Sequence, residues 1–256
     1  MFGEERKAQI INLLKLQGDV KVSNLADTYK VSEVTIRKDL QELEEEGLIK
    51  RVHGGAVLVH NTKFEPTFYE KVDKFIEEKI AIGKQAASMV EDGDTVALDG
   101  GTTNLQIARN IRANNLTVIT NSLDIAIELS NNHSNEVIVI GGTLRSHTRA
   151  LIGPIASSIL KNVRVDIAFV GANGISLDYG ITTPNMNEAQ TKREIIESAE
   201  RVIIVCDHSK FSEVCFAKIT DFDKIHYIVT DSKLDEGVRK EFREKGIRII
   251  TAKEGI

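Results

Sequence analysis

The sequence contains few of the residues that define disulfide-rich and metal-binding proteins. Its 256 residues include two cysteines, three prolines and no tryptophan, and only 5% are aromatic. Cys206 and Cys215 stand nine residues apart, outside any metal-binding or redox pattern, so we expect reduced thiols. The six histidines show no ligand spacing such as H-x-x-x-H. We therefore expect neither a metal site nor a cofactor.

Long apolar runs and an excess of positive charge are also missing. No run approaches the roughly 18 to 20 residues that a membrane-spanning helix needs, and residues 1–5 (MFGEE) lack the regions of a signal peptide. We expect a cytoplasmic protein with no membrane contact. The formal net charge is −5. Because counterion release from nucleic acid needs clustered cations, this charge argues against a general coat protein and leaves only local DNA binding.

What is present is an ordinary globular composition, with 41% hydrophobic and 28% charged residues. The chain is long enough for two domains with well-buried cores. Its polar segment 59–68, which contains Pro66, indicates a domain boundary. We expect one domain over 1–58, a linker over 59–74 and a second domain over 75–256. A helix is expected over 69–90.

Residues 22–56 have the pattern of a DNA-reading unit. Ser23 and Ser32 stand where side chains cap the first turns of two helices, which would begin nine residues apart. A preceding helix over 4–16 would complete a three-helix core. The last helix repeats apolar residues at i, i+4 and i+7, the spacing of a buried stripe, at Ile36, Leu40 and Leu43.

The opposite side of that last helix carries side chains that suit a recognition helix. Arg37 and Lys38 can reach phosphates or guanine acceptors, and Gln41 can pair with an adenine edge. Val34 or the Thr35 methyl can touch a thymine methyl. These side chains predict direct reading of base edges in the major groove.

A basic wing follows the recognition helix. Gly47 stops the helix, and residues 48–56 read as a short strand, a tight turn and a return strand. The wing would lie along the DNA backbone or in the adjacent minor groove. The predicted DNA-contacting set is Ser32, Val34, Thr35, Arg37, Lys38, Gln41, Lys50, Arg51, His53 and Gly54.

The alternative interpretation of this unit is a three-helix protein-interaction domain with a solvated charged face. Residues 1–58 hold nine Lys or Arg against ten Asp or Glu, so the unit is not basic overall. The acids, however, gather at Glu42 and at 44–46, at the far end of the second of the paired helices. Recognition usually uses the N-terminal end of the helix, and we therefore favour DNA binding.

From residue 95 onward, short β-branched runs alternate with helical patterns. That rhythm predicts an α/β domain built on a largely parallel sheet. The apolar runs are 95–98, 117–120, 136–140, 166–170, 201–206, 225–230 and 247–250.

The residues that follow the first of these runs form a candidate phosphate loop. In parallel α/β sheets, ligands sit at the carboxyl ends of the strands. Residues 99–103 (DGGTT) lead there into a helix. Two glycines let backbone N–H groups approach an anion, and two threonine hydroxyls add donors beside a helix N-terminus. The loop is neither a Walker loop nor G-x-G-x-x-G, so it does not suggest ATP or NAD. By itself it could mark only a tight turn.

Four further strand ends carry small or hydrogen-bonding residues: 120–122, 141–143, 171–174 and 207–210. A polyol phosphate would find donors on every side, although each Gly pair could be a turn and Lys210 a solvated cation. Residues 180–185 read as a loop, and the helix after them, which holds Lys192, is either a mobile element over a bound anion or a surface helix. The predicted effector-binding set is Asp99, Gly100, Gly101, Thr102, Thr103, Asn121, Ser122, Gly142, Gly171, Asn173, Lys192 and Lys210.

Taken together, these motifs resemble the DeoR-type bacterial transcriptional repressors, in order and along nearly the whole chain. The resemblance implies an N-terminal winged helix-turn-helix and a C-terminal sensor domain similar in fold to ribose-phosphate isomerase. It implies that a phosphorylated sugar binds there, and that dimers or tetramers act on operators of sugar uptake or breakdown genes. The matching segments are 32–40, 50–56, 99–103, 120–122, 171–174 and 207–211.

The rival from another class is a sugar-phosphate isomerase with an accessory helical head. Those isomerases carry Asp-Gly-Ala-Asp where this chain has VGAN at 170–173. Moving a proton between sugar carbons needs a positioned carboxylate, and only Glu188 or Glu194 could substitute. We therefore expect a regulator and no enzyme. Fructose, tagatose, glycerol and amino-sugar phosphates all remain open as effectors, as do the operator sequence and the direction of the response.

Overall fold

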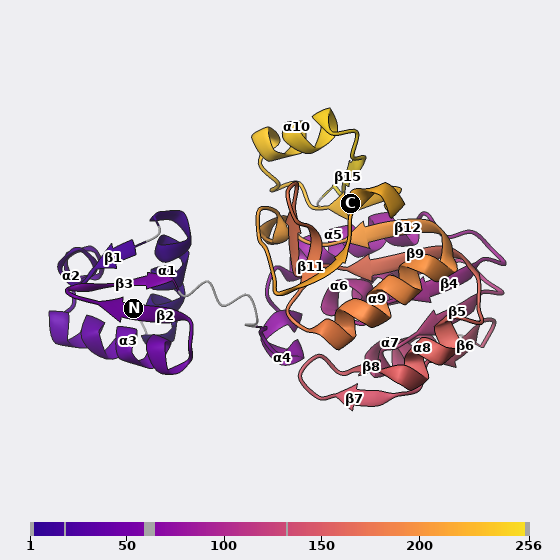
Figure 1. Ribbon diagram of the computed structural model, residues 1–256, viewed down its shortest axis with the longest axis horizontal. Coiled ribbons are helices and arrows are strands. Elements are labelled where there is room, and N and C mark those ends of the chain that lie inside the picture. Colours follow the sequence, from indigo (N-terminus) through magenta and orange to yellow (C-terminus); the bar gives the residue numbers. More distant parts are fainter. Residues whose placement is uncertain (1–2, 18, 59–64, 132, 254–256) are drawn as a thin grey trace. The chain divides into compact units, whose positions relative to one another are not determined.

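The computed structural model describes residues 3–17, 19–58, 65–131 and 133–253, and the chain divides into two compact units (Figure 1). The first comprises Met1–Phe64 and the second Glu65–Ile256. The linker predicted over 59–74 is therefore too long at its C-terminal end. Residues 65–74 belong to the second unit because they contain a helix whose Phe68 packs into that unit's core. Residues 59–64 lie outside the described part.

The first unit is a three-helix domain with a small antiparallel sheet, as predicted, plus one strand that was not predicted. The strand order is β1-β3-β2, and β1 pairs with β3. The elements are α1 (Gly3–Gln17), β1 (Asp19–Lys21), α2 (Val22–Tyr29), α3 (Glu33–Glu45), β2 (Ile49–Val52) and β3 (Gly55–Leu58).

The helix starts are set differently in α2 and α3. Ser32 caps α3 as predicted, its hydroxyl accepting from the Thr35 N–H at 3.1 Å. The prediction for Ser23 is wrong, because α2 begins at Val22 with no side-chain cap, eleven residues before α3. Strand β1 fixes this start: the extended Lys21 is the N-cap residue, and the Val22 N–H donates to the Gly54 carbonyl at 2.9 Å.

A buried ion pair joins the back of α3 to α1. Arg6 donates to both carboxylate oxygens of Asp39, at 2.6 and 3.0 Å, and both side chains are buried. Beside this pair lies the predicted apolar stripe of Ile36, Leu40 and Leu43, which is fully buried. Charged and apolar contacts therefore hold the same side of α3 to the rest of the unit.

The second unit contains a seven-stranded sheet in which every neighbouring pair is parallel, as expected. Each of the seven predicted apolar runs became one of its strands, in the order β15-β14-β12-β9-β4-β5-β6. The strands are β4 (Thr95–Leu98), β5 (Thr117–Thr120), β6 (Glu136–Val139), β9 (Val165–Gly171), β12 (Ala199–Val205), β14 (Tyr227–Thr230) and β15 (Ile249–Thr251).

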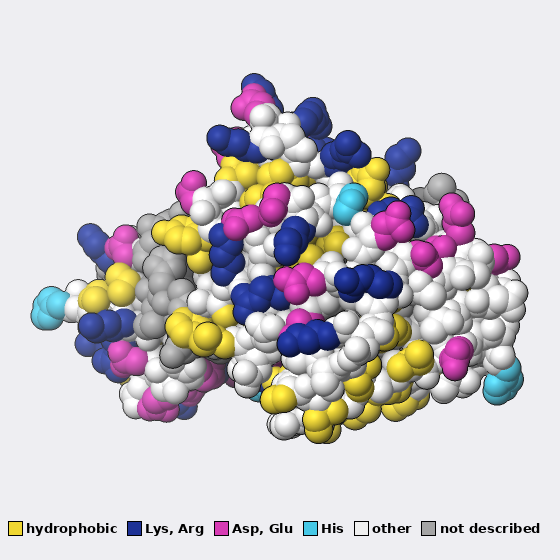
Figure 2. All heavy atoms as spheres, turned by 45° about the vertical axis from the view of Figure 1, so that its right-hand side comes forward, with side chains coloured by type: hydrophobic (Ala, Val, Ile, Leu, Met, Phe, Trp, Pro, Cys, Tyr) yellow, Lys and Arg dark blue, Asp and Glu magenta, His cyan; other side chains and the backbone are white. Residues whose placement is uncertain are grey.

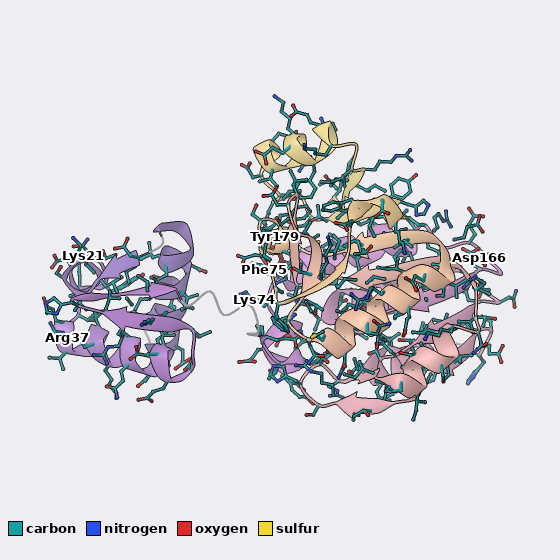
Figure 3. The ribbon with its side chains drawn as sticks, in the orientation of Figure 1. Lys21, Arg37, Lys74, Phe75, Asp166 and Tyr179 are labelled. Carbon is teal, nitrogen blue, oxygen red and sulfur yellow. The ribbon has the colours of Figure 1, made fainter. Side chains whose placement is uncertain are left out.

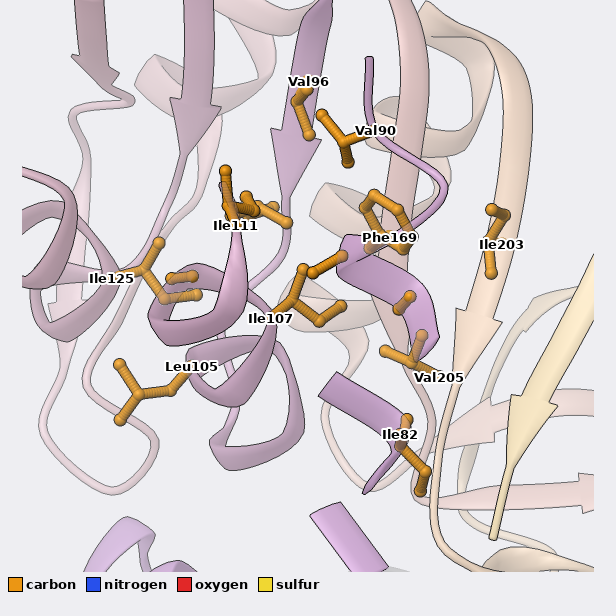
Figure 4. Packing of buried hydrophobic residues seen from close by; sticks show 14 of the residues in the cluster. Ile82, Val90, Val96, Leu105, Ile107, Ile111, Ile125, Phe169, Ile203 and Val205 are labelled. Atoms are coloured by element: carbon orange, nitrogen blue, oxygen red, sulfur yellow. The ribbon is translucent and has the colours of Figure 1, made fainter. Parts of the chain in front are cut away.

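Helices cover both faces of this sheet. Strand β4 shows why: Val96 and Leu98 point to one face and Ala97 to the other, so both faces are apolar. One core lies under α5 (Ile76–Ala87), α6 (Thr102–Asn110) and α7 (Leu123–Leu129), part of which Figure 4 shows. The other lies under α8 (Pro154–Leu160), α9 (Met186–Ser198) and α10 (Glu236–Glu244).

Helices α5 and α6 approach one another at a glycine. A Cβ built on Gly83 would lie 2.6 Å from the backbone carbonyl carbon of Gln106, too close for any side chain.

Two small antiparallel sheets and two 3₁₀ helices complete the described part of the unit. They are β7 (Thr143–Arg145) with β8 (Ala150–Ile152), β10 (Gly174–Ser176), β11 (Gly180–Thr183) and β13 (Ala217–Thr220) in the order β10-β11-β13, and η1 (His208–Lys210) and η2 (Phe222–Lys224).

Two local predictions are wrong. The helix expected over 69–90 is divided into α4 (Phe68–Val72) and α5, because Phe75 adopts the left-handed conformation with φ 56°. The loop expected at 180–185 contains the buried strand β11, which pairs with β10 and β13. Helix α9 after it is largely buried, so Lys192 does not lie on a surface helix.

The described residues contain no helix that is both long and apolar enough to span a bilayer. Within the same ranges, no group of three or more His, Cys, Asp or Glu side chains is arranged to hold a metal ion.

Candidate functional site

The face of α3 that points away from the core is exposed and carries the predicted DNA-contacting side chains. Val34 is 76% exposed, and the side chains of Arg37 and Lys38 are 60% and 79% exposed. Figure 3 labels Arg37 on this unit. Gln41 is exposed as well. The valine side chain is apolar and makes no favourable interaction with water. Its exposed position therefore suits contact with an apolar group such as a thymine methyl.

Carboxylates on α3 already engage part of this surface. The Arg37 guanidinium donates to Glu33 at 2.8 Å, and the Gln41 amide donates to Glu45 at 3.0 Å. These are pairs across one helical turn on an exposed face, which contribute only a few tenths of a kcal/mol. DNA can therefore replace these carboxylates as the hydrogen-bond partner with only a small loss of free energy.

The wing is a β2–β3 hairpin whose turn is at His53 and Gly54, with Gly54 at φ 77°. Lys50, Arg51 and His53 are all exposed, as the predicted role requires. Gly55 anchors the hairpin, because a Cβ there would lie 2.0 Å from the Val20 carbonyl oxygen of β1. The hairpin and α3 thus belong to one packed unit.

The second candidate site is a cavity at the carboxyl ends of the central strands. The residues that follow β4, β5, β9 and β12 all border it. Ten of the twelve predicted effector-binding residues line this cavity, and it therefore collects segments more than a hundred residues apart in sequence. They are Asp99, Gly100, Gly101, Thr102, Thr103, Asn121, Gly171, Asn173, Lys192 and Lys210.

Two predicted effector-binding residues, Ser122 and Gly142, do not border the cavity. The Ser122 hydroxyl caps α7 by accepting from the Ile125 N–H. Gly142 has φ 139° and lies against β8, where a Cβ would be 2.6 Å from the Ile152 carbonyl oxygen. Both positions therefore serve the packing of the unit.

Several cavity residues were missed by sequence reasoning. The largest group, six residues, comes from the segment 65–79, which had been assigned to a linker and to the helix expected over 69–90. Asn104 directly follows the predicted phosphate loop, so extending that motif by one residue would have found it. Asp207 belongs to the strand end 207–210, and Glu188 had been considered only as a base, whereas Thr148 gave no comparable signal. The missed set includes Glu65, Phe68, Lys71, Lys74, Phe75, Lys79, Asn104, Thr148, Glu188 and Asp207.

Lysines dominate the electrostatics of the cavity. Lys79 is buried, and burial lowers the pKa of its ammonium to about 8, although Asp207 acts in the opposite direction. Its Nζ donates to the backbone carbonyls of Lys71 and Lys74, the latter at 2.5 Å. Burial also lowers the pKa of Lys71. A bound anion would relieve this cost by neutralising the cluster.

The visible face of the second unit shows charges of both signs (Figure 2). In Figure 2, lysine, arginine and carboxylate side chains are interspersed over the second unit on the face that is visible. The five lysines that border the cavity are Lys71, Lys74, Lys79, Lys192 and Lys210.

The cavity carboxylates are bound within the protein. Asp99 Oδ2 accepts from the Lys192 ammonium and from the Gly171 N–H, the latter at 3.0 Å. Glu188 accepts from Arg145 at 3.1 Å and from the Thr148 hydroxyl at 2.5 Å. Burial acts to raise the pKa of Asp207, but Lys210 and Ser209 outweigh it and hold that pKa below its usual value.

This distribution gives no support to acid–base chemistry. Glu188 is held by Arg145, and Glu194, the other acid considered as a base, does not line the cavity. The arrangement can bind an anionic, hydroxyl-bearing ligand, and the protein as a whole joins an α/β ligand-binding unit to a winged-helix DNA-binding unit.

Comparison with known proteins gives the same division. The DeoR-like helix-turn-helix domain matches residues 6–62, and the DeoR C terminal sensor domain matches residues 74–232. The HTH-type transcriptional regulator GlpR of Haloferax volcanii is 38% identical over 251 residues, which cover 98% of each chain. A putative aga operon transcriptional repressor of Escherichia coli O157:H7 is 35% identical, covering 98% of this chain and 94% of its own. The chain belongs to the DeoR family of transcriptional regulators, and is a DNA-binding regulator rather than an enzyme.

Solved structures add a distant likeness. Ribose 5-phosphate isomerase A of Methanocaldococcus jannaschii shares 16% identity, with 54% of this chain and 56% of that chain covered and a TM-score of 0.40. A likeness of this size carries no information on chemistry.

Proposed function

We propose that this protein represses an operon of carbohydrate uptake or catabolism and that a phosphorylated sugar bound in the cavity controls it. The observation that carries the proposal is the five-lysine cavity at the strand ends of a chain whose other unit presents an exposed recognition helix. We further propose that the chain acts in the cytoplasm as a homodimer or tetramer, because a symmetric oligomer matches two operator half-sites.

The phosphate group is assigned to the loop before α6. Gly101, the N-cap residue of α6, and Thr102 and Thr103 in its first turn all line the cavity, so the N-terminus of this helix borders it. Helix N-termini and lysines both stabilise phosphate. The amides and carboxylates that also line the cavity suit the hydroxyl groups of a sugar.

The cavity also offers a physical route for control. Glu65, the first residue of the second unit, borders it, as does much of the segment up to Phe75, which Figure 3 labels next to Lys74. Glu65 accepts from Arg145 at 2.6 Å, and Arg145 also binds Glu188. A ligand that changes this network acts on the segment that enters the second unit from the DNA-binding unit. We propose that this segment has one arrangement that allows DNA binding and one that does not. A ligand that binds one arrangement more tightly shifts the population toward it and thereby changes the affinity for DNA.

Operator binding measured with and without a panel of sugar phosphates tests the proposal. We expect at least one of them to change the operator affinity by about 5-fold to 150-fold, which corresponds to a coupling of about 1 to 3 kcal/mol. Thr102→Ala and Lys210→Ala should remove this response while basal DNA binding persists. Operator affinity that no sugar phosphate changes would contradict the proposal, and response curves of both variants that overlay the unaltered protein's would contradict the assignment of the cavity.

A further inference from the structure

Asn104 is an unsatisfied polar side chain in the wall of the cavity. It lies in the first turn of α6, is 0% exposed and borders the cavity. Neither its Nδ2 nor its Oδ1 has a hydrogen-bond partner, and among the described residues no other cavity-lining side chain has a fully buried polar atom without a partner. Buried polar groups in native proteins are almost always paired. Within a ligand cavity, the missing partner therefore points to an atom of the ligand.

The space that Asn104 faces lies in front of the α-carbon of Gly171. A Cβ built on Gly171 would lie 3.6 Å from Asp99 Oδ2, 3.7 Å from Asn104 Nδ2 and 3.9 Å from Lys192 Nζ. Three polar groups thus converge on a point that the protein leaves without a side chain. Asp99 and Lys192 bind each other, and Lys192 also donates to the Gly171 carbonyl at 3.1 Å. Asn104 alone of the three brings a donor and an acceptor that are both unused.

The chemistry of an amide limits what can pair with it. The side chain presents an NH₂ donor and a carbonyl acceptor next to each other. A phosphate oxygen would pair with the donor but would place negative charge against the acceptor. An ammonium group would pair with the acceptor and leave the donor without a partner. A hydroxyl group both donates and accepts, so it can serve either atom.

We propose that Asn104 is a specificity-determining residue, which binds a hydroxyl group of the effector in the space in front of Gly171. The inference rests on the proposed function, because it assigns one end of the sugar phosphate placed in the cavity there. The phosphate group interacts with the lysines and the loop before α6, and Asn104 selects ligands whose hydroxyl reaches Gly171. Inorganic phosphate, which has no such carbon-bound hydroxyl, does not depend on Asn104.

Two substitutions test this assignment in the full-length protein. Asn104→Leu keeps a similar side-chain volume and removes both polar atoms. Gly171→Ala places a methyl group in the same space with no protein contact under 3.6 Å, and Gly171 is not among the residues with positive φ. Asn110→Leu is the matched control, since it makes the same chemical change on α6 at a residue that does not line the cavity.

Isothermal titration calorimetry is performed with the sugar phosphate that binds most tightly in a panel, and with inorganic phosphate. We expect Asn104→Leu and Gly171→Ala to weaken the sugar phosphate by about tenfold or more, while the affinity for inorganic phosphate stays unchanged and Asn110→Leu has no effect on either. The ligand-free melting temperature of Asn104→Leu should not fall, because the variant buries no unpaired amide.

Three outcomes separate the claims. Unchanged sugar-phosphate affinity in Asn104→Leu and Gly171→Ala overturns the role of Asn104 and leaves the proposed function standing. An equal loss of inorganic phosphate affinity in Asn104→Leu also overturns it, because the amide then contacts the phosphate. If no sugar phosphate binds the unaltered protein, the proposed function itself fails, and this assignment fails with it.

Discussion

Functional side chains are arranged in opposite ways in the two units. On α3, all of those predicted to touch DNA except the half-buried Thr35 are exposed, while Ile36 and Leu40, which hold the helix in place, are buried on its other side. In the cavity, Asp99 and Lys192 are themselves buried and joined to each other. Function and stability are therefore carried by separate residues in the first unit and by shared residues in the second. Each of the following predictions would break or sharpen this contrast.

The largest effect is expected at the buried side of α3. Asp39→Ala leaves the Arg6 guanidinium buried without its partner, and breaking such a pair typically costs about 3 to 5 kcal/mol. Chemical denaturation should show the first unit unfolding at lower denaturant concentration, with DNA binding lost as a consequence. The double variant Arg6→Met with Asp39→Leu removes both charges and should recover most of the stability. A single variant as stable as the unaltered protein would show that the pair does not hold α3 in place.

A second large effect is expected at the α5–α6 contact, where neither Gly83 nor Gln106 lines the cavity. Gly83→Ala would place a methyl group 2.6 Å from backbone atoms of α6, so the helices must move apart. Overpacking of this kind costs about 1 to 3 kcal/mol. Since the loop proposed to bind phosphate leads into α6, effector affinity should fall together with the melting temperature. Gly93→Ala, where nothing lies within 4 Å of the added carbon but φ is 88°, gives the cost of backbone strain alone.

Removal of an exposed cation from α3 or from strand β2 of the wing should change DNA binding without changing stability. Arg37→Ala should weaken operator binding by about 1 to 3 kcal/mol if the guanidinium reads a base, whereas Lys50→Ala should weaken binding to every sequence similarly. Both melting temperatures should stay unchanged, because the side chains contact only the surface. Fluorescence anisotropy with operator and scrambled duplexes distinguishes the two. Retained operator affinity in both variants would place the interface elsewhere.

A smaller effect is expected from pH. Lys79 has a pKa of about 8 and is charged below that value, so anion binding should weaken as the pH rises through about 8. A phosphate monoester keeps its charge above about pH 7 because its second pKa is near 6. Between about pH 7 and about pH 9 we expect a loss of roughly tenfold at most, measured by calorimetry. Lys79→Met should flatten the profile, and Lys84→Met, an exposed lysine on the same helix, should leave it unchanged.

The central sheet could be predicted because its seven apolar runs are buried on both faces, which leaves a continuous hydrophobic signal in the sequence. The loop at 99–103 could be placed in the cavity for the related reason that all parallel strands end at one edge. The recognition helix could also be predicted from the sequence, because its buried and exposed residues alternate with the helical period over a short segment.

Other features depend on contacts between distant segments, which leave no local pattern. Strand β1 has three residues and exists because β3 offers it an edge. Lys71 and Lys79 read as surface lysines of a helix, and only the left-handed turn at Phe75 and the packing of α5 bring them into the cavity. Ser122 and Gly142 follow strands as ligand-binding residues do, yet their side chain and α-carbon face other parts of the fold.

If Arg37 contacts DNA as predicted, its hydrogen bond to Glu33 means that the guanidinium already has a partner when it meets the duplex. To bind a guanine or a phosphate, it must release a carboxylate one turn away, which then lies near the negatively charged duplex. The two acceptors on the edge of a guanine would offer the guanidinium two hydrogen bonds in place of the one that it gives up. An intramolecular competitor of this kind lowers the time spent on random DNA more than the time spent on an operator, and thereby speeds the search for it.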